Sequence, residues 1–285
     1  MRWTGGRRSR NVEDRRGRRI GRKTAGGGIG VIVIALIAMY FGVDPSVFLN
    51  QQGAPGLSPP SYQVSTSSSL EEQQLVDFVS VVLADTEDTW HMLFKGWDRT
   101  YQEPTLVLFS GAVESACGYA QAAVGPFYCP RDQKVYIDLS FYNDLKNRFR
   151  APGDFAQAYV IAHEIGHHVQ TLLGISQKVH NLRGSLSQTE INRLSVMQEL
   201  QADCFAGIWA HHADRTRQIL EEGDIEEALN AASSIGDDRL QKQSRGYVTP
   251  DSFTHGSSDQ RVRWFRRGLE TGNVSQCNTF KAENL

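Results

Sequence analysis

The chain has 285 residues, of which 40% are hydrophobic and 22% are charged, a composition typical of a folded protein and unlike that of disordered or collagen-like chains. Its net charge of −2 conceals an asymmetry, because residues 1–24 hold ten basic and two acidic side chains. That segment therefore carries +8, which leaves −10 for residues 25–285. Since nucleic-acid binding needs a basic surface, the acidic bulk argues against a nucleic-acid partner.

The first element predicted along the chain is a membrane span. Residues 24–43 contain no charged side chain, and 20 helical residues at about 1.5 Å each cover roughly the 30 Å of a bilayer core. The basic residues before this run predict that residues 1–23 stay in the cytoplasm and that the rest of the chain lies outside. We therefore predict an uncleaved signal-anchor. The alternative is a cleaved signal peptide, although no A-x-A site follows the run.

A flexible linker and one larger folded part follow. Residues 44–69 are rich in Pro, Gly, Ser and Gln, a composition typical of flexible tethers, and residues 70–285 are long enough for a large domain. This part holds all four cysteines, which in an exported domain predicts two disulfides. Three pairings exist. We favour Cys117–Cys129, which closes a local loop, and Cys204–Cys277, which ties the C-terminus to the domain; the alternative is that some are free thiols.

The hydrophobic pattern of residues 70–285 predicts an α+β fold, mainly helical, with a small sheet. Helices are expected over residues 70–94, 155–173, 188–212, 223–243 and 258–268, and strands over 104–109, 126–129 and 134–138, the last two as a hairpin. Asp154 is the expected N-cap of the central helix, which Gly174 should end.

The central helix carries the HExxH motif, which runs from His163 to His167. Residues i and i+4 lie about 40° apart around a helix, so both imidazoles can reach one metal ion. Neutral imidazole is a common zinc ligand, which makes this pair candidate ligands of Zn²⁺. Glu164, between them, is placed to take a proton from a zinc-bound water, whose pKa the metal lowers toward neutrality. His168 points about 100° away and is expected to pack or support rather than ligate.

The helix over residues 188–212 offers a third ligand, which a catalytic zinc needs beside an open fourth position. Glu199 and Asp203 are spaced i and i+4, on one face of that helix. An ExxxD pattern after HExxH resembles the gluzincin arrangement. The resemblance implies that Glu199 ligates the metal and that Asp203 accepts a hydrogen bond from His163 and fixes its tautomer. The alternative is a pair of solvated acids, against which the apolar neighbours on this helix argue.

A segment near the C-terminus offers a donor for the oxyanion that forms during peptide hydrolysis. His255 precedes a turn of small residues that leads into the last predicted helix, and Arg261 is expected to support His255 or the ligand helix. The segment resembles the His-Pro-x-x-x-x-Arg element of membrane-associated gluzincins, except that Gly256 stands in place of the proline. The alternative is a purely structural helix start. Further candidate donors are Tyr119, Tyr128, Tyr136 and Tyr159.

Six runs of the sequence together resemble the bacterial neutral zinc metallopeptidase family of the YpfJ type. They are NVEDRR (11–16), GPFYCPRDQKVYID (125–138), GDFAQAYVIAHEIGHHVQ (153–170), ELQADCFAG (199–207), EEALNAASSIGDDRLQ (226–241) and DSFTHGSSDQRVRWF (251–265). The resemblance spans nearly the whole chain. It implies a membrane-tethered, zinc-dependent metallopeptidase of zincin-like fold, with its catalytic domain on the periplasmic side of the inner membrane of a Gram-negative-type cell.

The leading hypothesis is therefore a zinc endopeptidase whose substrate is a peptide or protein. In it, residues 134–138 serve as an edge strand that binds an extended peptide through backbone hydrogen bonds. One alternative is a non-peptidase zinc amidohydrolase acting on cell-wall material. Another is a non-catalytic interaction module with structural zinc, but structural sites have four protein ligands and the sequence offers three. The oligomeric state is not indicated by the sequence.

Overall fold

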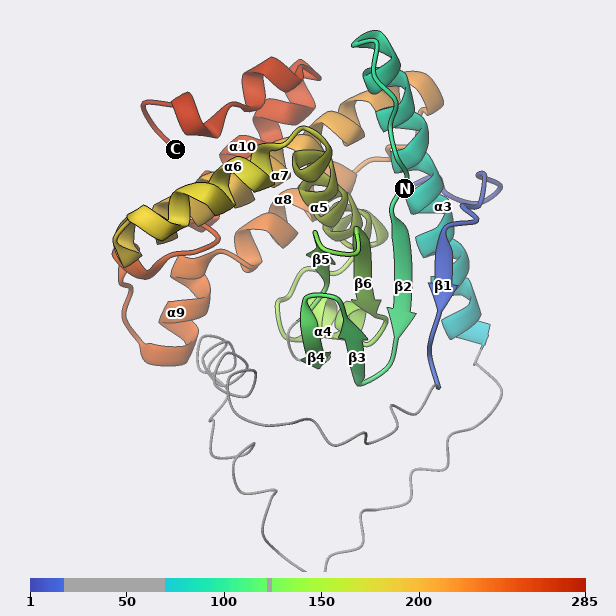
Figure 1. Ribbon diagram of the computed structural model, residues 1–285. Helices are drawn as coiled ribbons and strands as arrows, with labels where there is room; N and C mark the ends of the chain where they lie inside the picture. Colours follow the sequence, from blue (N-terminus) through green and yellow to red (C-terminus); the bar gives the residue numbers. More distant parts are fainter. Residues whose placement is uncertain (18–69, 122–124) are drawn as a thin grey trace, which may run out of the picture.

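The computed structural model describes residues 1–17, 70–121 and 125–285, and its mainly helical fold with a small sheet confirms the α+β class (Figure 1). The helices are α3 (Leu70–Gly96), α4 (Phe141–Asn147), α5 (Asp154–Leu172), α6 (Ile175–Leu182), α7 (Gln188–Arg217), α8 (Asp224–Ser234), α9 (Asp237–Arg245) and α10 (Ser258–Thr271). The strands are β1 (Val12–Asp14), β2 (Thr105–Phe109), β3 (Ala112–Ser115), β4 (Gly118–Gln121), β5 (Phe127–Cys129) and β6 (Lys134–Asp138).

The predicted membrane span and linker, residues 24–43 and 44–69, lie outside the described residues and stay predictions. None of the helices in the described part of the chain has the length and hydrophobicity that a membrane crossing needs.

The larger of the two sheets in the described residues has the order β1-β2-β6-β5, and β3 pairs with β4 in the smaller one. In the larger sheet, β1, β2 and β6 are parallel and β5 is antiparallel to β6. The predicted hairpin is thus confirmed. The prediction that residues 134–138 form an edge strand is wrong, because β6 pairs with β2 on one side and with β5 on the other. Alternation along a strand does not reveal how many neighbours the strand has. β5 is therefore the edge strand at this end of the sheet. In Figure 1, α5 lies above β5 and β6.

The N-terminal segment belongs to the domain. The sequence suggested a separate basic segment over residues 1–23, whereas the structure packs residues 1–17 against α3 and β2 (Figure 1). β1 pairs with β2, and Arg7 contacts both Glu87 (2.9 Å) and Asp88 (2.8 Å) of α3. Among the described basic side chains of this segment, Arg7 and Arg8 therefore meet acidic side chains of α3.

Two helix boundaries differ from the predicted ones. Asp154 is the first residue of α5, not its N-cap, and its carboxylate accepts a hydrogen bond from the amino group of Met1 at 2.6 Å. The single helix expected over 223–243 is broken at Gly236, where a Cβ would lie 2.5 Å from the backbone nitrogen of Ser258. Because of this break, α9 begins at Asp237.

Helix α7 lies between α5 and α10 with unusually close backbone contacts. A Cβ on Gly166 of α5 would lie 2.9 Å from the carbonyl oxygen of Ala202, and one on Gly207 would lie 2.1 Å from that of Phe265. Both distances are shorter than real Cβ contacts. The absence of a side chain at these two positions therefore allows the three helices to approach one another.

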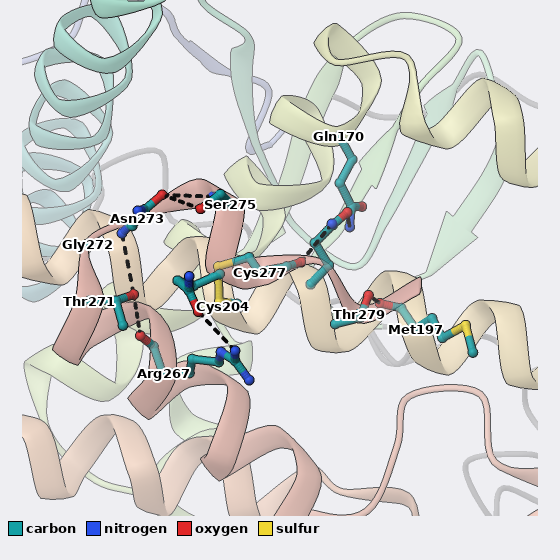
Figure 2. Close-up of a disulfide and its surroundings, with 12 residues drawn as sticks. Gln170, Met197, Cys204, Arg267, Thr271, Gly272, Asn273, Ser275, Cys277 and Thr279 are labelled. Carbon is teal, nitrogen blue, oxygen red and sulfur yellow. Dashed lines mark hydrogen bonds between the residues drawn. A yellow bond between two sulfur atoms is a disulfide. The ribbon is translucent and has the colours of Figure 1, made fainter. Parts of the chain in front are cut away.

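Both favoured disulfides, Cys117–Cys129 and Cys204–Cys277, are present. Figure 2 shows the second one joining α7 to the short 3₁₀ helix η5 (Val274–Cys277) that follows α10. Beside it, Gln201 donates to the Cys277 carbonyl at 2.9 Å and Thr279 donates to the Met197 carbonyl at 2.6 Å. The C-terminus is thus held against the helix that carries Glu199.

Removing this disulfide is expected to lower the free energy of unfolding by about 4 kcal/mol, because it closes a long loop in the unfolded chain. The double variant Cys204→Ala/Cys277→Ala, which opens a separation of 73 residues, should lose more than Cys117→Ala/Cys129→Ala, which opens one of 12. Urea unfolding of both variants measures the difference. An equal or smaller loss for the long loop would contradict the expectation.

Candidate metal centre

Three predicted ligands converge between α5 and α7. The Nε2 atom of His163 lies 3.1 Å from Oε2 of Glu199, and the Nε2 atom of His167 lies 3.3 Å from Oε1. One ligand atom from each residue lies within 4.8 Å of the other two. Two imidazole nitrogens and a carboxylate oxygen at this separation fit the donor set of a catalytic zinc site. Folding thus brings together residues that stand 36 positions apart in the sequence.

Asp203 orients the first histidine. Its Oδ1 atom lies 2.8 Å from Nδ1 of His163 and also accepts a hydrogen bond from the Tyr159 hydroxyl at 2.5 Å. Arg261 donates to both oxygens of the same carboxylate at 2.9 Å. Because the carboxylate only accepts, Nδ1 of His163 carries the proton and Nε2 offers its lone pair to the metal. Arg261 therefore supports the ligand helix through Asp203.

The charges of this buried cluster shift the pKa values of its members. Burial opposes ionisation of Asp203, but Arg261 and His163 outweigh it and lower the pKa of this carboxyl to about 2. Burial also opposes protonation of His163, yet Asp203 and Glu199 raise its pKa to about 10. A position that attracts a proton this strongly is one where negative potential is concentrated, which suits a bound cation.

Gln170 orients the second histidine. Its Oε1 atom lies 2.9 Å from Nδ1 of His167, and its amide nitrogen donates to the Gln198 carbonyl at 2.7 Å and to the Gln201 side chain at 3.1 Å. The amide oxygen must accept, so His167 also presents Nε2 to the metal position. The two donors of Gln170 are fixed by α7, the helix that carries Glu199.

Glu164 lies beside the three ligands and is 7% exposed. Burial raises the pKa of its carboxyl, and the positive charges of His163 and His167 offset only part of that effect. For Glu199 the balance is reversed, since the same two histidines overcome burial and hold its pKa well below the usual range. Two neighbouring glutamates thus differ in their affinity for a proton, as a base and a ligand should.

Zinc affinity is expected to rise by at least about tenfold per pH unit between about pH 6 and pH 8. In the metal-free protein His163 has a pKa of about 10 and is protonated in this range. Zinc must displace that proton, and proton competition weakens as the pH rises. Competition with a chelator of known pH dependence measures the affinity; a constant affinity would contradict the expectation.

An open cavity of about 420 Å³ adjoins the ligands. Its walls come from β5, α6, α7 and the loop before α10, and it is lined by Tyr128, Pro130, His167, Ser176, Val179, His180, Arg183, Ser195, Gln198, Glu199, Thr254 and His255. Two ligands thus face a space that a substrate can enter, and the candidate oxyanion donor His255 faces the same space.

Asp237 organises the loop that carries His255. One of its carboxylate oxygens accepts the backbone N–H groups of Thr254 and His255 at 2.7 Å and of Gly256 at 3.1 Å, and the other lies 3.3 Å from Nδ1 of His255. Burial lowers the pKa of His255, but Asp237 and Glu199 outweigh it and raise the pKa. The imidazole is thereby favoured in its protonated, donating form.

The glycine that interrupts the His-Pro-x-x-x-x-Arg resemblance has a structural reason. Gly256 has φ of +94° and donates its backbone N–H to Asp237. Proline fixes φ near −65° and has no N–H, so it could do neither. The departure from the resemblance thus accompanies the hydrogen bond by which Gly256 joins this loop to Asp237.

Of the four tyrosines considered as oxyanion donors, Tyr128 alone lines the cavity within the described part of the chain. The hydroxyls of Tyr159 and Tyr136 are bonded to Asp203 and Asp132, and Tyr119 is exposed on β4. His168 is fully buried, with its Nε2 atom 2.6 Å from the Gln102 carbonyl and its Nδ1 atom 3.1 Å from the Tyr128 hydroxyl. It packs and supports, as expected.

The contacts of Gln170 and Asp237 at the site, and the hydrogen bond from Tyr159 to Asp203, were not predicted from the sequence. Gln170 stands three positions after His167, a spacing that places both on one helix face and could have pointed to it. Asp237 stands 18 positions before His255, and no local pattern connects the two.

A second group of acids, Asp154, Asp224 and Glu227, also brings carboxylate oxygens close together. The amino group of Met1 lies among them, 2.6 Å from Asp154 and 3.2 Å from Asp224. These contacts give the group the character of an ion-pair cluster rather than that of a second metal centre.

An HExxH helix, a glutamate from a second helix and an adjoining open cavity define a zinc metallopeptidase type of site. A family model described as "Putative neutral zinc metallopeptidase" matches residues 1–280, and the chain belongs to this family. The resemblance drawn from the sequence is thus confirmed. Membership implies Zn²⁺ as the cofactor and a protein or peptide as the substrate.

Relatives of the chain occur in Escherichia coli and in Mycobacterium tuberculosis. The chain is 53% identical over 290 residues to "Uncharacterized protein YpfJ" of Escherichia coli K12, covering 98% of this chain and 99% of that protein. It is 39% identical over 266 residues to "Uncharacterized protein Rv2575" of Mycobacterium tuberculosis, covering 87% and 86%. No solved structure matches the chain.

Proposed function

We propose that the protein is a zinc-dependent endopeptidase in which Glu164 activates the attacking water. The observation that carries the proposal is the convergence of His163, His167 and Glu199 at an open cavity, next to a buried glutamate. Among the described residues these three form the ligand group at this position. A site with three protein ligands leaves a coordination position open for catalysis.

Each neighbouring side chain has a role that its contacts support. Zinc, when bound, supplies Lewis-acid chemistry, polarising the carbonyl of the peptide bond and making water a better acid. Asp203 and Gln170 keep the Nδ1–H of the two histidines engaged. Glu164 takes the proton from the attacking water and passes it to the leaving amine. His255 donates to the oxygen on which negative charge develops.

The test is hydrolysis of a mixed peptide library by the purified full chain, before and after removal of zinc with a chelator and after its return. Cleavage that disappears and returns with zinc is the expected result. Purified cell-wall material serves as the parallel substrate. Its digestion without peptide cleavage would favour a cell-wall amidohydrolase, and the absence of both activities in zinc-loaded protein would favour a non-catalytic module.

Replacing His255 with Ala is expected to lower kcat by about 10²- to 10³-fold with little change in KM, because the donor acts on charge that develops in the transition state. His91→Ala, which removes an exposed imidazole of α3, is the matched control and should leave both constants unchanged. Steady-state kinetics on one cleaved peptide measures the effect. A change confined to KM would contradict the assigned role.

We also propose that the protein acts in an oxidising compartment outside the cytoplasm and is held at the membrane by residues 24–43. The two disulfides support the first part, since such bonds are rare in reducing compartments. The absence of charged side chains from residues 24–43 supports the second.

A further inference from the structure

One arginine, Arg183, lines the cavity beside the metal ligands. Arg183 follows α6, in the short 3₁₀ helix η3 (Arg183–Ser185), and its guanidinium donates to the Ser195 hydroxyl of α7 at 2.8 Å. This hydrogen bond connects the two walls and directs the charge toward the cavity that both residues line. An arginine keeps its charge at any pH at which the protein is folded.

The charge balance inside the cavity differs from that of most of the chain, which is acidic. Among the described residues that line it, Arg183 is the permanent cation and Glu199 the carboxylate. Glu199 is a metal ligand in the proposed function, and its charge is then shared with a dication. Electrostatic attraction depends on nearby charges far more than on the −10 of residues 25–285, because distant charges are screened.

We propose that the part of the substrate that occupies this cavity carries a carboxylate, which Arg183 binds. A guanidinium and a carboxylate can form two parallel hydrogen bonds, an arrangement that a neutral amide does not reproduce. The carboxylate is that of an acidic side chain next to the cleaved bond or the free C-terminus of a short peptide. This inference rests on the proposed function for the position of the substrate.

The test uses the zinc-loaded full chain with Glu164→Gln, which should bind peptides without cleaving them. Fluorescent peptides carry Glu, Gln or Lys at the variable position, each with a free or an amidated C-terminus, and anisotropy measures Kd. We expect a Kd about tenfold lower for peptides that carry one of the two carboxylates, either the Glu side chain or the free C-terminus, than for the matched uncharged peptides. Adding Arg183→Gln should remove this difference, and adding Arg183→Glu should make Lys peptides bind more tightly. Arg193→Gln, an exposed arginine of α7 outside the cavity, is the control.

Equal Kd values for Glu, Gln and Lys peptides with either C-terminus would overturn the proposal, as would a preference that survives Arg183→Gln. Because binding is measured in a variant that does not cleave, these outcomes stand apart from the proposed function. That function fails on a different result, namely the absence of zinc-dependent cleavage by the unaltered chain.

A second inference comes from the contacts of the N-terminal segment. Glu87 of α3 is 1% exposed, and its carboxylate is bonded to Arg7, to Ser9 at 2.5 Å and to the Asn11 side chain at 2.9 Å. Without residues 1–17 this buried charge would lose these three partners, which is strongly unfavourable.

Backbone hydrogen bonds run along the same segment. They are Arg2 N–H to the Ile219 carbonyl at 2.7 Å, Ser9 N–H to that of Ser80 at 2.9 Å, Leu106 N–H to that of Asn11 at 2.8 Å and Arg15 N–H to that of Leu108 at 2.8 Å. They join it to α3, to β2 and to the chain after α7. Such contacts form only between parts of the chain that share a compartment.

We infer that residues 1–17 and residues 70–285 lie on the same side of the membrane. A single crossing at residues 24–43 would put about 30 Å of hydrocarbon between them, and none of these hydrogen bonds could form. The orientation expected from the basic residues, with residues 1–23 in the cytoplasm and the domain outside, is replaced by one in which both flanks of residues 18–69 face the same compartment.

Cysteine labelling of the full chain in intact bacterial cells tests this inference. Arg10→Cys and Lys178→Cys each introduce one thiol at an exposed position, one in the N-terminal segment and one on α6. A membrane-impermeant maleimide should react with both variants or with neither, before and after the membrane is permeabilised. Reaction of one thiol in intact cells and of the other only after permeabilisation would overturn the inference.

Discussion

Replacing Glu164 with Gln is expected to lower kcat/KM by about 10²- to 10⁴-fold, the range typical for loss of a general base. The amide has the size of the carboxylate but cannot accept the proton of the attacking water. Since Glu164 is not one of the converging ligands, zinc content should remain near one ion per chain. Steady-state kinetics together with metal analysis separates loss of the base from loss of the metal.

Glu226→Gln is the matched control, because it makes the same chemical change at an exposed position of α8. It should leave kcat/KM unchanged. Equal cleavage by Glu164→Gln and the unaltered chain would remove Glu164 from the mechanism. A parallel loss of zinc would instead point to a role in holding the metal.

Replacing Asp203 with Asn is expected to lower the free energy of unfolding by about 3–5 kcal/mol, because the guanidinium of Arg261 would be left buried without its counter-ion. Zinc affinity should fall by about 10- to 100-fold as well. An amide nitrogen facing Nδ1 of His163 favours the tautomer that protonates Nε2, the atom meant for the metal. Urea unfolding of the metal-free protein and chelator competition measure the two effects separately.

Asp77→Asn is the control for the charge change itself. Asp77 and Arg8 form an exposed pair, each with about half of its side chain in solvent, so water replaces much of what the variant loses. Its unfolding midpoint and zinc affinity should stay close to those of the unaltered chain. Similar losses in both variants would show that burial of the Asp203 cluster is not what makes it important.

The local parts of the site could be predicted from the sequence because helical spacing fixes them. His163, Glu164 and His167 lie on one helix, and Glu199 and Asp203 on another, so each face follows from the period of the helix. The structure adds the distance between the two helices. It also shows that Arg261 reaches Asp203, one of the two alternatives that the sequence left open.

Contacts between distant segments could not be predicted in the same way. The pairing of β1 with β2 joins residues more than 90 positions apart, and a three-residue strand in a run of arginines has no alternating pattern. Asp237 is a similar case, because it accepts hydrogen bonds from three backbone N–H groups of the loop before α10. Which strand lies at an edge depends on neighbours that the strand's own residues do not specify.

Gly166 stands between the two histidines of the motif and affects how precisely the metal ligands are placed, although it takes no part in the chemistry. Zinc–nitrogen bonds are about 2.0–2.1 Å long, so the three ligands must be placed to within a few tenths of an ångström. Ala202 of α7 touches α5 where Gly166 has no side chain, only three positions from Glu199. The single hydrogen atom at this position therefore allows the short distance between α5 and α7. A methyl group there would push the helices apart and increase the separation of the metal ligands that they carry.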